Sequence, residues 1–406
     1  MVELSEVLRA AAVRREPAFP KAEYEARVAK VKKAMGEQGI DVLLVHHTPN
    51  FCYLYGYQSP LANWYGCLIL PLEGEPIAHV IDIEVANLMV HGWDTDNIYT
   101  FDWRWQVDAP GQLVEILQKR GLADKRIGLE FRLPGCNALT GFELRDRLPQ
   151  AQIVDASDVV LYFRAVKSPA ELAHIHEAAR ITDIGMKAGL EAIGPGKTDN
   201  DMFQAAVGAM AGAGSEYLSI QPLAYVGPWT TLTHVTAKRR LMKTGDTATV
   251  ELTGVYHRYS APLFRTGVVG QPSDLVKRLA DYVIARMEIL YSNARPGRAA
   301  SEVANAVAEG AKGIEPPEAR EQRLKTGRSL AGNVYTVGIG FPPDWVEHST
   351  FISEKHDRPL EPGMVFHTPT GAGVLNQIGV SFSETMVITE TGCETLSKLP
   401  RELTVV

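Results

Sequence analysis

The stretch TATVELTGVYHRYSAPLFRTGVV, residues 247–269, decides the fold of the second half of the chain. Its first seven residues alternate apolar side chains with threonine or glutamate, and this period of two predicts a half-buried β-strand. Gly254 ends that strand, and a second strand over about residues 263–269 follows within hairpin distance. Glu251 lies on the polar face among threonines, where it is either a solvated strand residue or a functional carboxylate.

A second domain opens upstream of this stretch, near residue 160. Ser168-Pro-Ala-Glu171 combines a serine N-cap, a proline at the first helical position and a glutamate three residues after the cap, which predicts a helix start. Downstream, the pattern predicts helices over residues 273–292 and 299–312, a glycine-broken segment at 337–340, and closing strands over 363–368 and 381–389. We therefore expect an α+β domain over residues 161–406.

The first 160 residues follow a different pattern. Residues 20–39 predict an amphipathic helix, because their apolar residues recur every three or four positions. Short apolar runs bounded by glycine, proline or charge predict strands over residues 41–45, 66–70, 77–81 and 126–130. Helical stretches lie between several of these strands, so we expect an α/β domain over residues 1–160 and two domains in all.

The composition excludes several classes of protein. Of the 406 residues, 45% are hydrophobic and 22% are charged, which is typical of a soluble globular protein. The formal net charge of −7 disfavours binding to nucleic acid or to an anionic membrane. Four cysteines without a CxxC pair indicate neither a disulfide framework nor a zinc finger, and no window is apolar enough for a secretory signal or a membrane span. We expect a cytoplasmic protein whose partner is a small molecule.

Several short motifs follow one another in an order that resembles a known family. They are Gly245-Asp246, Arg265-Thr266, Gly338-Ile-Gly340, Glu361-Pro-Gly-Met364 and Glu384-Thr385. Over residues 160–400 this order resembles the pita-bread hydrolases of peptidase family M24, and the upstream domain resembles the N-terminal domain of the creatinase and prolidase branch. The resemblance implies a creatinase-like α/β domain followed by an α+β pita-bread catalytic domain, and a homodimer.

The metal-ligand positions of the family are altered in this chain. The resemblance implies two Asp, one His and two Glu at positions that hold Glu251, Pro262, Val337, Pro369 and Ser383 here. Among these, only Glu251 is a strong ligand, because proline and valine offer no side-chain donor. We therefore expect no metal and no other cofactor.

The local strings are similar to the metal-free members of the family, creatinase and above all ectoine hydrolase. These strings are residues 251–259, 262–266, 340–345 and Phe366-His367. The resemblance implies a hydrolase that cleaves a non-peptide carbon–nitrogen bond, in a cyclic amidine, guanidino or amide group of a small polar metabolite.

Three residues are the candidate catalytic groups. Glu251 would either attack the substrate carbon directly or activate water as a general base, and the sequence leaves both roles open. His234 matches the acid/base histidine of creatinase and suits proton delivery to a leaving nitrogen. Glu384 would pair with a cationic substrate nitrogen, because a buried carboxylate without a counter-charge is costly.

Further residues are candidates for binding the substrate. His367 is either a satisfied core histidine or a site residue, and Arg265 either ties two strands together or contacts substrate. The other candidates are aromatic, acidic or imidazole side chains: Tyr256, the loop residues Asp344, Trp345 and His348, and Trp64 and Tyr65. Aromatic clusters such as the one holding Trp64 and Tyr65 usually serve packing, but the creatinase branch implies a contribution from a neighbouring subunit.

Two alternative functions stay open. One is a metal-dependent Xaa-Pro dipeptidase or aminopeptidase with an atypical site, using one ion bound by His234, Glu251, His367 and Glu384. The other is a non-catalytic protein that binds a ligand or a partner protein through the cleft that serves as the active site in the enzymes of this family. The substrate itself is not specified by the sequence.

Overall fold

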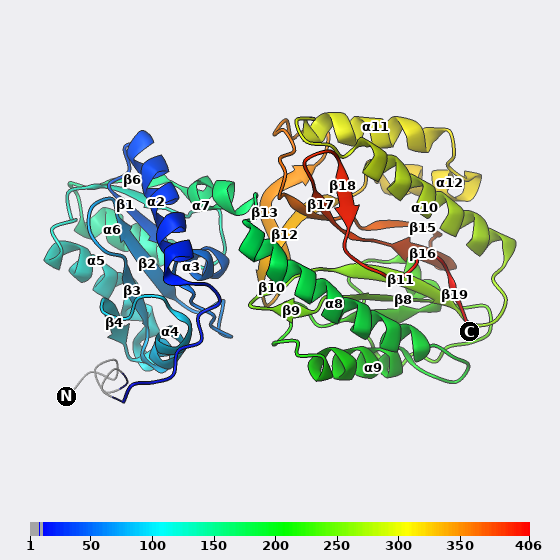
Figure 1. The fold of residues 1–406 in the computed structure, drawn as a ribbon, viewed down its shortest axis with the longest axis horizontal. Helices are drawn as coiled ribbons and strands as arrows, with labels where there is room; N and C mark the ends of the chain where they lie inside the picture. Colours follow the sequence, from blue (N-terminus) through cyan, green and yellow to red (C-terminus); the bar gives the residue numbers. More distant parts are fainter. Residues whose placement is uncertain (1–7, 9–10) are drawn as a thin grey trace. The chain divides into compact units, whose positions relative to one another are not determined.

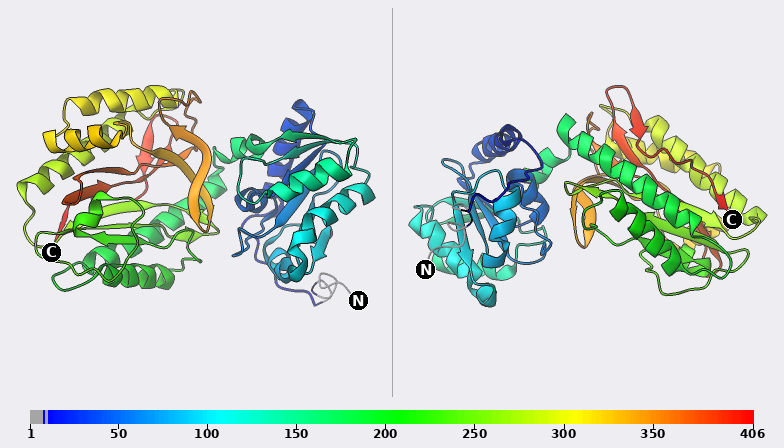
Figure 2. Two further views of the ribbon diagram at one scale, coloured as in Figure 1. Left: turned by 180° about the vertical axis from the view of Figure 1, so that it is seen from behind. Right: turned by 60° about the horizontal axis from the view of Figure 1, so that its bottom comes forward.

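The computed structural model describes residue 8 and residues 11–406 of the chain. The chain divides into two compact units, the first ending at Arg164 and the second beginning at Ala165 (Figures 1 and 2). Among the described residues, no helix is both long and apolar enough to cross a membrane.

The described part of unit 1 contains a mixed sheet of six strands in the order β4-β3-β2-β1-β5-β6. The pairs β1–β2 and β2–β3 are antiparallel, whereas β3–β4, β1–β5 and β5–β6 are parallel. The strands are β1 (Val42–Val45), β2 (Gly66–Pro71), β3 (Ile77–Ile81), β4 (Ile98–Phe101), β5 (Arg126–Leu129) and β6 (Gln152–Asp155).

Helices cover the sheet of unit 1. They are α2 (Lys21–Glu37), α3 (Thr48–Tyr55), α4 (Val85–His91), α5 (Ala109–Lys119), α6 (Ala138–Arg147) and α7 (Ser157–Arg164), with short 3-10 turns at Asp82–Glu84 and Trp103–Asp108. Leu113 and Leu117 of α5 and Leu144 of α6 share one core with Val42 and Leu44 of β1. The predicted helix 20–39 and the four predicted strands of this unit are therefore confirmed.

Unit 2 is built around two larger sheets. One has the order β18-β17-β14-β12-β10-β9 with β13 also paired to β12, the other has the order β19-β11-β8-β7, and β15 and β16 form a separate pair. The strands are β7 (Leu223–Val226), β8 (Thr247–Leu252), β9 (Val255–Tyr256), β10 (Tyr259–Ser260), β11 (Leu263–Val268), β12 (Val334–Phe341), β13 (Asp344–Ile352), β14 (Val365–His367), β15 (Thr370–Val374), β16 (Ile378–Phe382), β17 (Thr385–Ile388), β18 (Cys393–Thr395) and β19 (Thr404–Val405).

Two groups of helices enclose these strands (Figures 1 and 2). The helices are α8 (Pro169–Glu191), α9 (Asp199–Gly212), α10 (Asp274–Asn293), α11 (Ala300–Lys312) and α12 (Pro317–Thr326), and a 3-10 turn spans Gly227–Thr231. The core beneath α8 and α9 includes Val250 and Leu252 of β8, while α10 packs Val283 and Met287 against Phe382 of β16. The α/β unit followed by an α+β pita-bread unit confirms the fold class expected from the sequence.

The predicted helix start at Ser168 is confirmed in detail. The Ser168 hydroxyl accepts a hydrogen bond from the backbone N–H of Glu171, and the Glu171 carboxylate accepts one from the backbone N–H of Ser168. This capping box satisfies two of the N–H groups that a helix N-terminus leaves unpaired.

Three predictions for the C-terminal half need correction. Residues 337–340 are part of the continuous strand β12, where glycine is required because a Cβ at Gly338 would lie 2.7 Å from Glu347 Oε1. The expected loop holding Asp344, Trp345 and His348 is strand β13, which pairs along β12. The closing strand 381–389 is two strands, because β16 pairs with β15 and β17 pairs with β14.

Candidate functional site

Unit 2 contains a cavity of about 540 Å³ that has Glu251 in its wall. We call it the Glu251 cavity. Its wall includes side chains from strands β7, β8, β11 and β12 and from the loops beside them, among them Tyr225, His234, Glu251, Phe264, Tyr335 and Pro369. This volume lies in the range of sites for small molecules.

The Glu251 carboxylate is buried without a partner. Only 4% of the residue is exposed, and its side chain makes no hydrogen bond or ion pair with any described residue. Burial raises the pKa of Glu251 well above its ordinary value. Burial also raises the pKa values of the Tyr225 and Tyr335 phenols, and the Glu251 charge adds to that rise. Both hydroxyls therefore stay protonated beside the carboxylate.

The sheet explains why Glu251 has this environment. Strand β8 runs between β7 and β11, so Glu251 is flanked by Leu223 on one side and Phe264 on the other. Every residue of β8 is buried, and Thr249 on the same face bonds to Thr266 through hydroxyls 3.0 Å apart. The polar face of this strand is therefore internal, not half-buried as its alternation suggests, because threonine hydroxyls cover Thr247 and Thr249 and the cavity wall holds Glu251.

His234 lines the same cavity as Glu251. It lies in the segment between the 3-10 turn Gly227–Thr231 and β8, is exposed, and has a φ of 57°. A positive φ is uncommon for a residue with a side chain and is found more often at functional positions. Two of the three residues expected to be catalytic thus share one cavity.

His367 lies behind the cavity wall and is absent from its lining. Its Nδ1 is 2.7 Å from the Tyr335 hydroxyl, and its Nε2 is 2.7 Å from the Ser383 hydroxyl. Burial lowers the pKa of His367 to about 3, so the ring is neutral at physiological pH. Both ring nitrogens are already bonded within the protein, which matches the alternative of a satisfied core histidine.

Glu384 and Arg265 form a buried ion pair outside the cavity lining. Arg265 Nη2 donates to Glu384 Oε1 over 2.7 Å, and Arg265 Nη1 donates to the backbone oxygen of Ser383 over 2.7 Å. Burial raises the pKa of Glu384, and Arg265 opposes that rise. Arg265 therefore ties β11 to the segment before β17, and Glu384 is held by Arg265, away from the cavity.

The remaining candidates in unit 2 also lie outside the cavity lining. Tyr256 packs edge-on against His174. Asp344 accepts a hydrogen bond from the backbone N–H of Val346 and lies 3.1 Å from the ring of His348, which is exposed. Trp345 is buried and donates its Nε1–H to the Tyr335 hydroxyl over 3.0 Å. Trp345 is thus linked to the cavity through Tyr335.

Trp64 and Tyr65 belong to unit 1. Trp64 is 38% exposed, whereas Tyr65 is buried and its hydroxyl is 3.1 Å from His79 Nδ1. The Tyr65 ring packs edge-on against Phe101. Within unit 1, Tyr65 is therefore a core residue and Trp64 a surface residue.

The structure adds cavity residues that the sequence did not indicate. Tyr225 and Tyr335 bring phenolic hydroxyls, and α12 and the segment after it bring Arg323 and Arg328. Arg323 is bonded to Glu315 over 2.8 and 2.9 Å, whereas Arg328 is exposed and has no hydrogen-bond or ion-pair partner among the described residues. A prediction of helix α12 would have drawn attention to these arginines.

The positions that resemble metal ligands do not fit a dinuclear metal centre. Glu251 is the one carboxylate among them, while Pro262, Val337 and Pro369 have no side-chain donor and Ser383 offers a neutral hydroxyl. Within residues 8 and 11–406, no group of three or more His, Cys, Asp or Glu side chains is arranged to hold a metal ion. We assign no chemical step to a metal.

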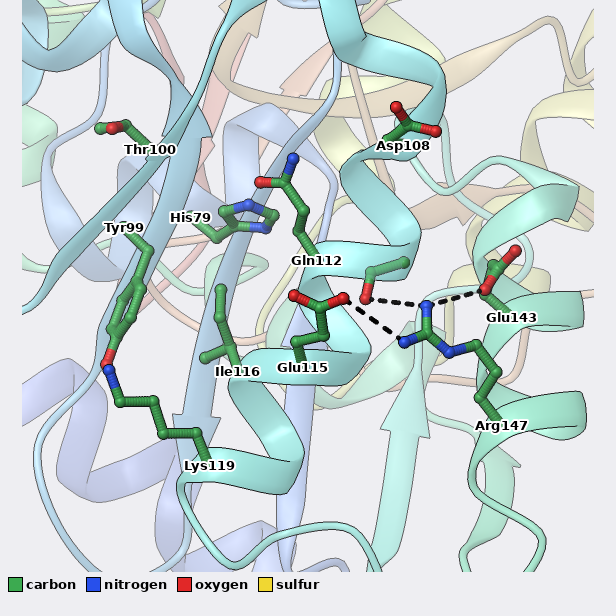
Figure 3. A pocket seen from close by; sticks show the side chains of 11 residues that line it. His79, Tyr99, Thr100, Asp108, Gln112, Glu115, Ile116, Lys119, Glu143 and Arg147 are labelled. Atoms are coloured by element: carbon green, nitrogen blue, oxygen red, sulfur yellow. Dashed lines mark hydrogen bonds and ion pairs between the residues drawn. The ribbon is translucent and has the colours of Figure 1, made fainter.

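Unit 1 has a cavity of its own, about 660 Å³ in volume, between β3, β4, α5 and α6 (Figure 3). Its charged residues are Asp108, Glu115, Lys119, Glu143 and Arg147, and Arg147 is held by Glu115 and Glu143 at 3.5 and 3.4 Å. His79 and Gln112 lie next to each other in its wall (Figure 3). None of the candidate residues from the sequence lines this cavity, and its arginine is already neutralised.

A different known family model matches each of the two units. Residues 173–390 match the model of metallopeptidase family M24, and residues 27–166 match that of the creatinase/prolidase N-terminal domain. The chain is 30% identical to ectoine hydrolase from Halomonas elongata over 401 residues, which cover 95% of this chain and 98% of that protein. It is 26% identical to the Xaa-Pro dipeptidase of Pyrococcus horikoshii over 379 residues, or 93% and 98% of the two chains.

Solved structures share the two-domain fold. The X-Pro aminopeptidase from Thermotoga maritima aligns with a TM-score of 0.78 at 20% identity, covering 93% of this chain and 99% of that one. The prolidase from Pyrococcus horikoshii aligns with a TM-score of 0.75 at 24% identity, with the same coverage. At these identities the likeness concerns the fold alone.

Proposed function

The chain belongs to metallopeptidase family M24 and carries the creatinase/prolidase N-terminal domain, and from this premise we propose that it is a metal-independent hydrolase of a non-peptide carbon–nitrogen bond. The observation that carries the proposal is the Glu251 carboxylate, buried and unpartnered in the wall of a cavity of about 540 Å³. With one carboxylate at the five positions that match the family's metal ligands, this chain needs another means of activating water or substrate.

Glu251 and His234 divide the chemistry between them. As a general base, Glu251 takes a proton from water while the water oxygen bonds to the substrate carbon and the carbon–nitrogen bond breaks. As a nucleophile, Glu251 bonds to that carbon itself, the carbon–nitrogen bond breaks as the nitrogen leaves, and water then hydrolyses the acyl-enzyme to restore the carboxylate. In both routes His234 delivers a proton to the leaving nitrogen, so that water is added across the bond.

The cavity and the relatives support a substrate class. The cavity volume suits a small metabolite, and the unpaired guanidinium of Arg328 favours a substrate with a carboxylate. The ectoine hydrolase from Halomonas elongata, 30% identical over nearly the whole chain, supports a cyclic amidine or a related amide or guanidino acid. We also propose that the active form of the protein is a homodimer.

Turnover of a small panel tests this function. Ectoine, hydroxyectoine, creatine and N-acetyl amino acids are incubated with the protein, with and without a strong chelator. We expect hydrolysis of at least one compound, no loss of rate on chelation, and a fall in kcat of about 10³-fold or more in Glu251→Gln. The matched control is Glu394→Gln, an exposed carboxylate outside the cavity, which should retain wild-type activity.

The alternatives give different results in the same assays. Stoichiometric Mn, Zn, Fe or Co in the purified protein, with cleavage of Xaa-Pro dipeptides that chelation abolishes, would replace the proposal by a metal-dependent dipeptidase. Binding of panel compounds without any turnover would indicate a non-catalytic protein.

A further inference from the structure

Tyr335 lies where a hydrogen-bonded chain of buried side chains meets the Glu251 cavity. Its hydroxyl accepts a hydrogen bond from Trp345 Nε1, a group that can only donate, over 3.0 Å. The same hydroxyl is 2.7 Å from His367 Nδ1, and His367 Nε2 is 2.7 Å from the Ser383 hydroxyl. Tyr335 is the member of this chain that lines the cavity.

The direction of each hydrogen bond follows from the donors available. The Ser383 oxygen accepts the backbone N–H of Phe264 over 2.7 Å. Ser383 is completely buried, and among the described residues the one acceptor within reach of its own proton is His367 Nε2. If Nε2 carried the ring proton instead, the Ser383 proton would be buried without an acceptor, which is unfavourable.

The neutral His367 ring is therefore protonated on Nδ1. That N–H then donates to the Tyr335 hydroxyl, whose oxygen already accepts from Trp345. With two donors on its oxygen, the hydroxyl of Tyr335 keeps its own proton for a third partner. Among the described residues, the Tyr335 hydroxyl has no hydrogen-bond partner besides Trp345 and His367, and Tyr335 lines the cavity that also holds Glu251.

We propose that Tyr335 is a catalytic residue whose hydroxyl donates a hydrogen bond to the substrate atom that gains negative charge when Glu251 or its water adds to the carbon. That atom is the oxygen of an amide or the second nitrogen of an amidine. The proposal rests on the proposed function. A donor oriented before the reaction stabilises the transition state without reorganisation, because Trp345 and His367 already hold its oxygen. His367 and Ser383 act as positioning residues.

The tautomer of His367 is the first test, and it needs no substrate. In protein labelled with ¹⁵N-histidine, long-range ¹H–¹⁵N NMR distinguishes Nδ1–H from Nε2–H, and the His367→Asn variant assigns the signal. We expect Nδ1–H in the wild type. In Ser383→Ala the donor to Nε2 is gone and the Nδ1–H form is no longer enforced, so we expect a mixture of both tautomers, with Tyr335 donating to Nδ1 in the Nε2–H form. An Nε2–H ring in the wild type overturns the proposal.

Kinetics on the best substrate of the ectoine, creatine and N-acetyl amino acid panel give the second test. We expect Tyr335→Phe to lower kcat by about 10²–10³-fold with a much smaller change in KM. Ser383→Ala should lower kcat by a smaller factor, because in the Nε2–H fraction the proton of Tyr335 is donated to His367 Nδ1 and not to the substrate. Tyr291→Phe is the matched control, since it also removes a phenol bonded to a buried hydroxyl, that of Thr368 at 3.0 Å, but lies outside the cavity.

The outcomes separate this inference from the proposed function. If Glu251→Gln is inactive while Tyr335→Phe is as active as Tyr291→Phe, the role of Tyr335 is wrong and the hydrolase stands. If Glu251→Gln keeps its activity, or if no panel compound is hydrolysed, the proposed function fails and the role of Tyr335 fails with it.

Discussion

At the scale of single residues, Glu251 lowers the stability of the folded protein while it serves the proposed function. Its carboxylate is 4% exposed and has no partner among the described residues, an arrangement that destabilises the folded state when the group is charged. Packing alone would favour an apolar or hydrogen-bonded side chain on β8. A residue that costs stability where it stands is a candidate for function, and the cavity beside it agrees with that interpretation.

The burial of the Glu251 carboxylate predicts how the unfolding free energy depends on pH. Because burial raises the pKa of Glu251, the folded protein keeps a proton that the unfolded chain releases above its own pKa of about 4.3. The contribution of Glu251 is therefore neutral at low pH, and it lowers the unfolding free energy progressively as pH rises towards the folded pKa. Glu251→Gln lacks this penalty, and we expect it to be more stable than wild type by about 0.5–2 kcal/mol at high pH.

Thermal unfolding between pH 5 and pH 9 measures this difference. The Tm advantage of Glu251→Gln should grow with pH, reaching a few degrees. The exposed Glu394→Gln should show no such trend. A variant that is less stable than wild type across the range would mean that the Glu251 carboxylate is satisfied in the folded protein.

At the scale of elements, α8 and α9 pack against each other and share a core with Val250 and Leu252 of strand β8. Two glycines of α8 face this contact. A Cβ at Gly185 would lie 2.3 Å from Met210 Cγ, whereas a Cβ at Gly189 would lie 3.5 Å from the nearest atoms of Ala206 and Val250. One glycine is therefore required by close approach and the other is not.

Alanine at these two positions should have opposite effects. In a helix, alanine is favoured over glycine by about 1 kcal/mol, so Gly189→Ala should be neutral or raise the unfolding free energy by up to that amount. Gly185→Ala gains the same propensity but forces Met210, which is completely buried, to move. We expect a net loss of about 1–3 kcal/mol in urea unfolding. Equal stability of the two variants would contradict the close packing seen between α8 and α9.

At the scale of the whole molecule, the charges separate into an exposed and a buried set. The net charge of −7 is accompanied by many surface ion pairs, such as Lys325–Glu321, whose side chains are 67% and 69% exposed. Lys167 and Glu347 differ, because their side chains are 0% and 2% exposed and the pair joins the beginning of unit 2 to β13. Exposed pairs contribute little and are screened by salt, whereas a buried pair is strongly coupled.

Removing one partner of the buried pair should be costly. Lys167→Met leaves the buried Glu347 without its ammonium partner, and we expect a loss of about 3–5 kcal/mol that does not depend on salt. Lys325→Met, the exposed match, should change the unfolding free energy by less than about 1 kcal/mol. The double variant Lys167→Met/Glu347→Leu should recover much of the loss. Similar small effects for both single variants would show that water reaches the Lys167–Glu347 pair.

The sequence by itself determined the local elements and the family. The capping box at Ser168, the helix of residues 21–37 and the strands β8 and β11 depend on neighbours within a few residues, so their patterns are readable without the fold. The order of short motifs indicated the family, and the family implied the two-domain architecture.

Only the tertiary structure decided which polar groups meet. Glu384 is 119 residues from Arg265, and the strand pairing that brings them together is not encoded in the local pattern of either. The same holds for Tyr335, which carried no signal in the sequence and yet joins His367, 32 residues away, at the cavity wall. Backbone preferences act over a turn or a strand, whereas hydrogen-bond partners are set by which strands become neighbours when the core packs.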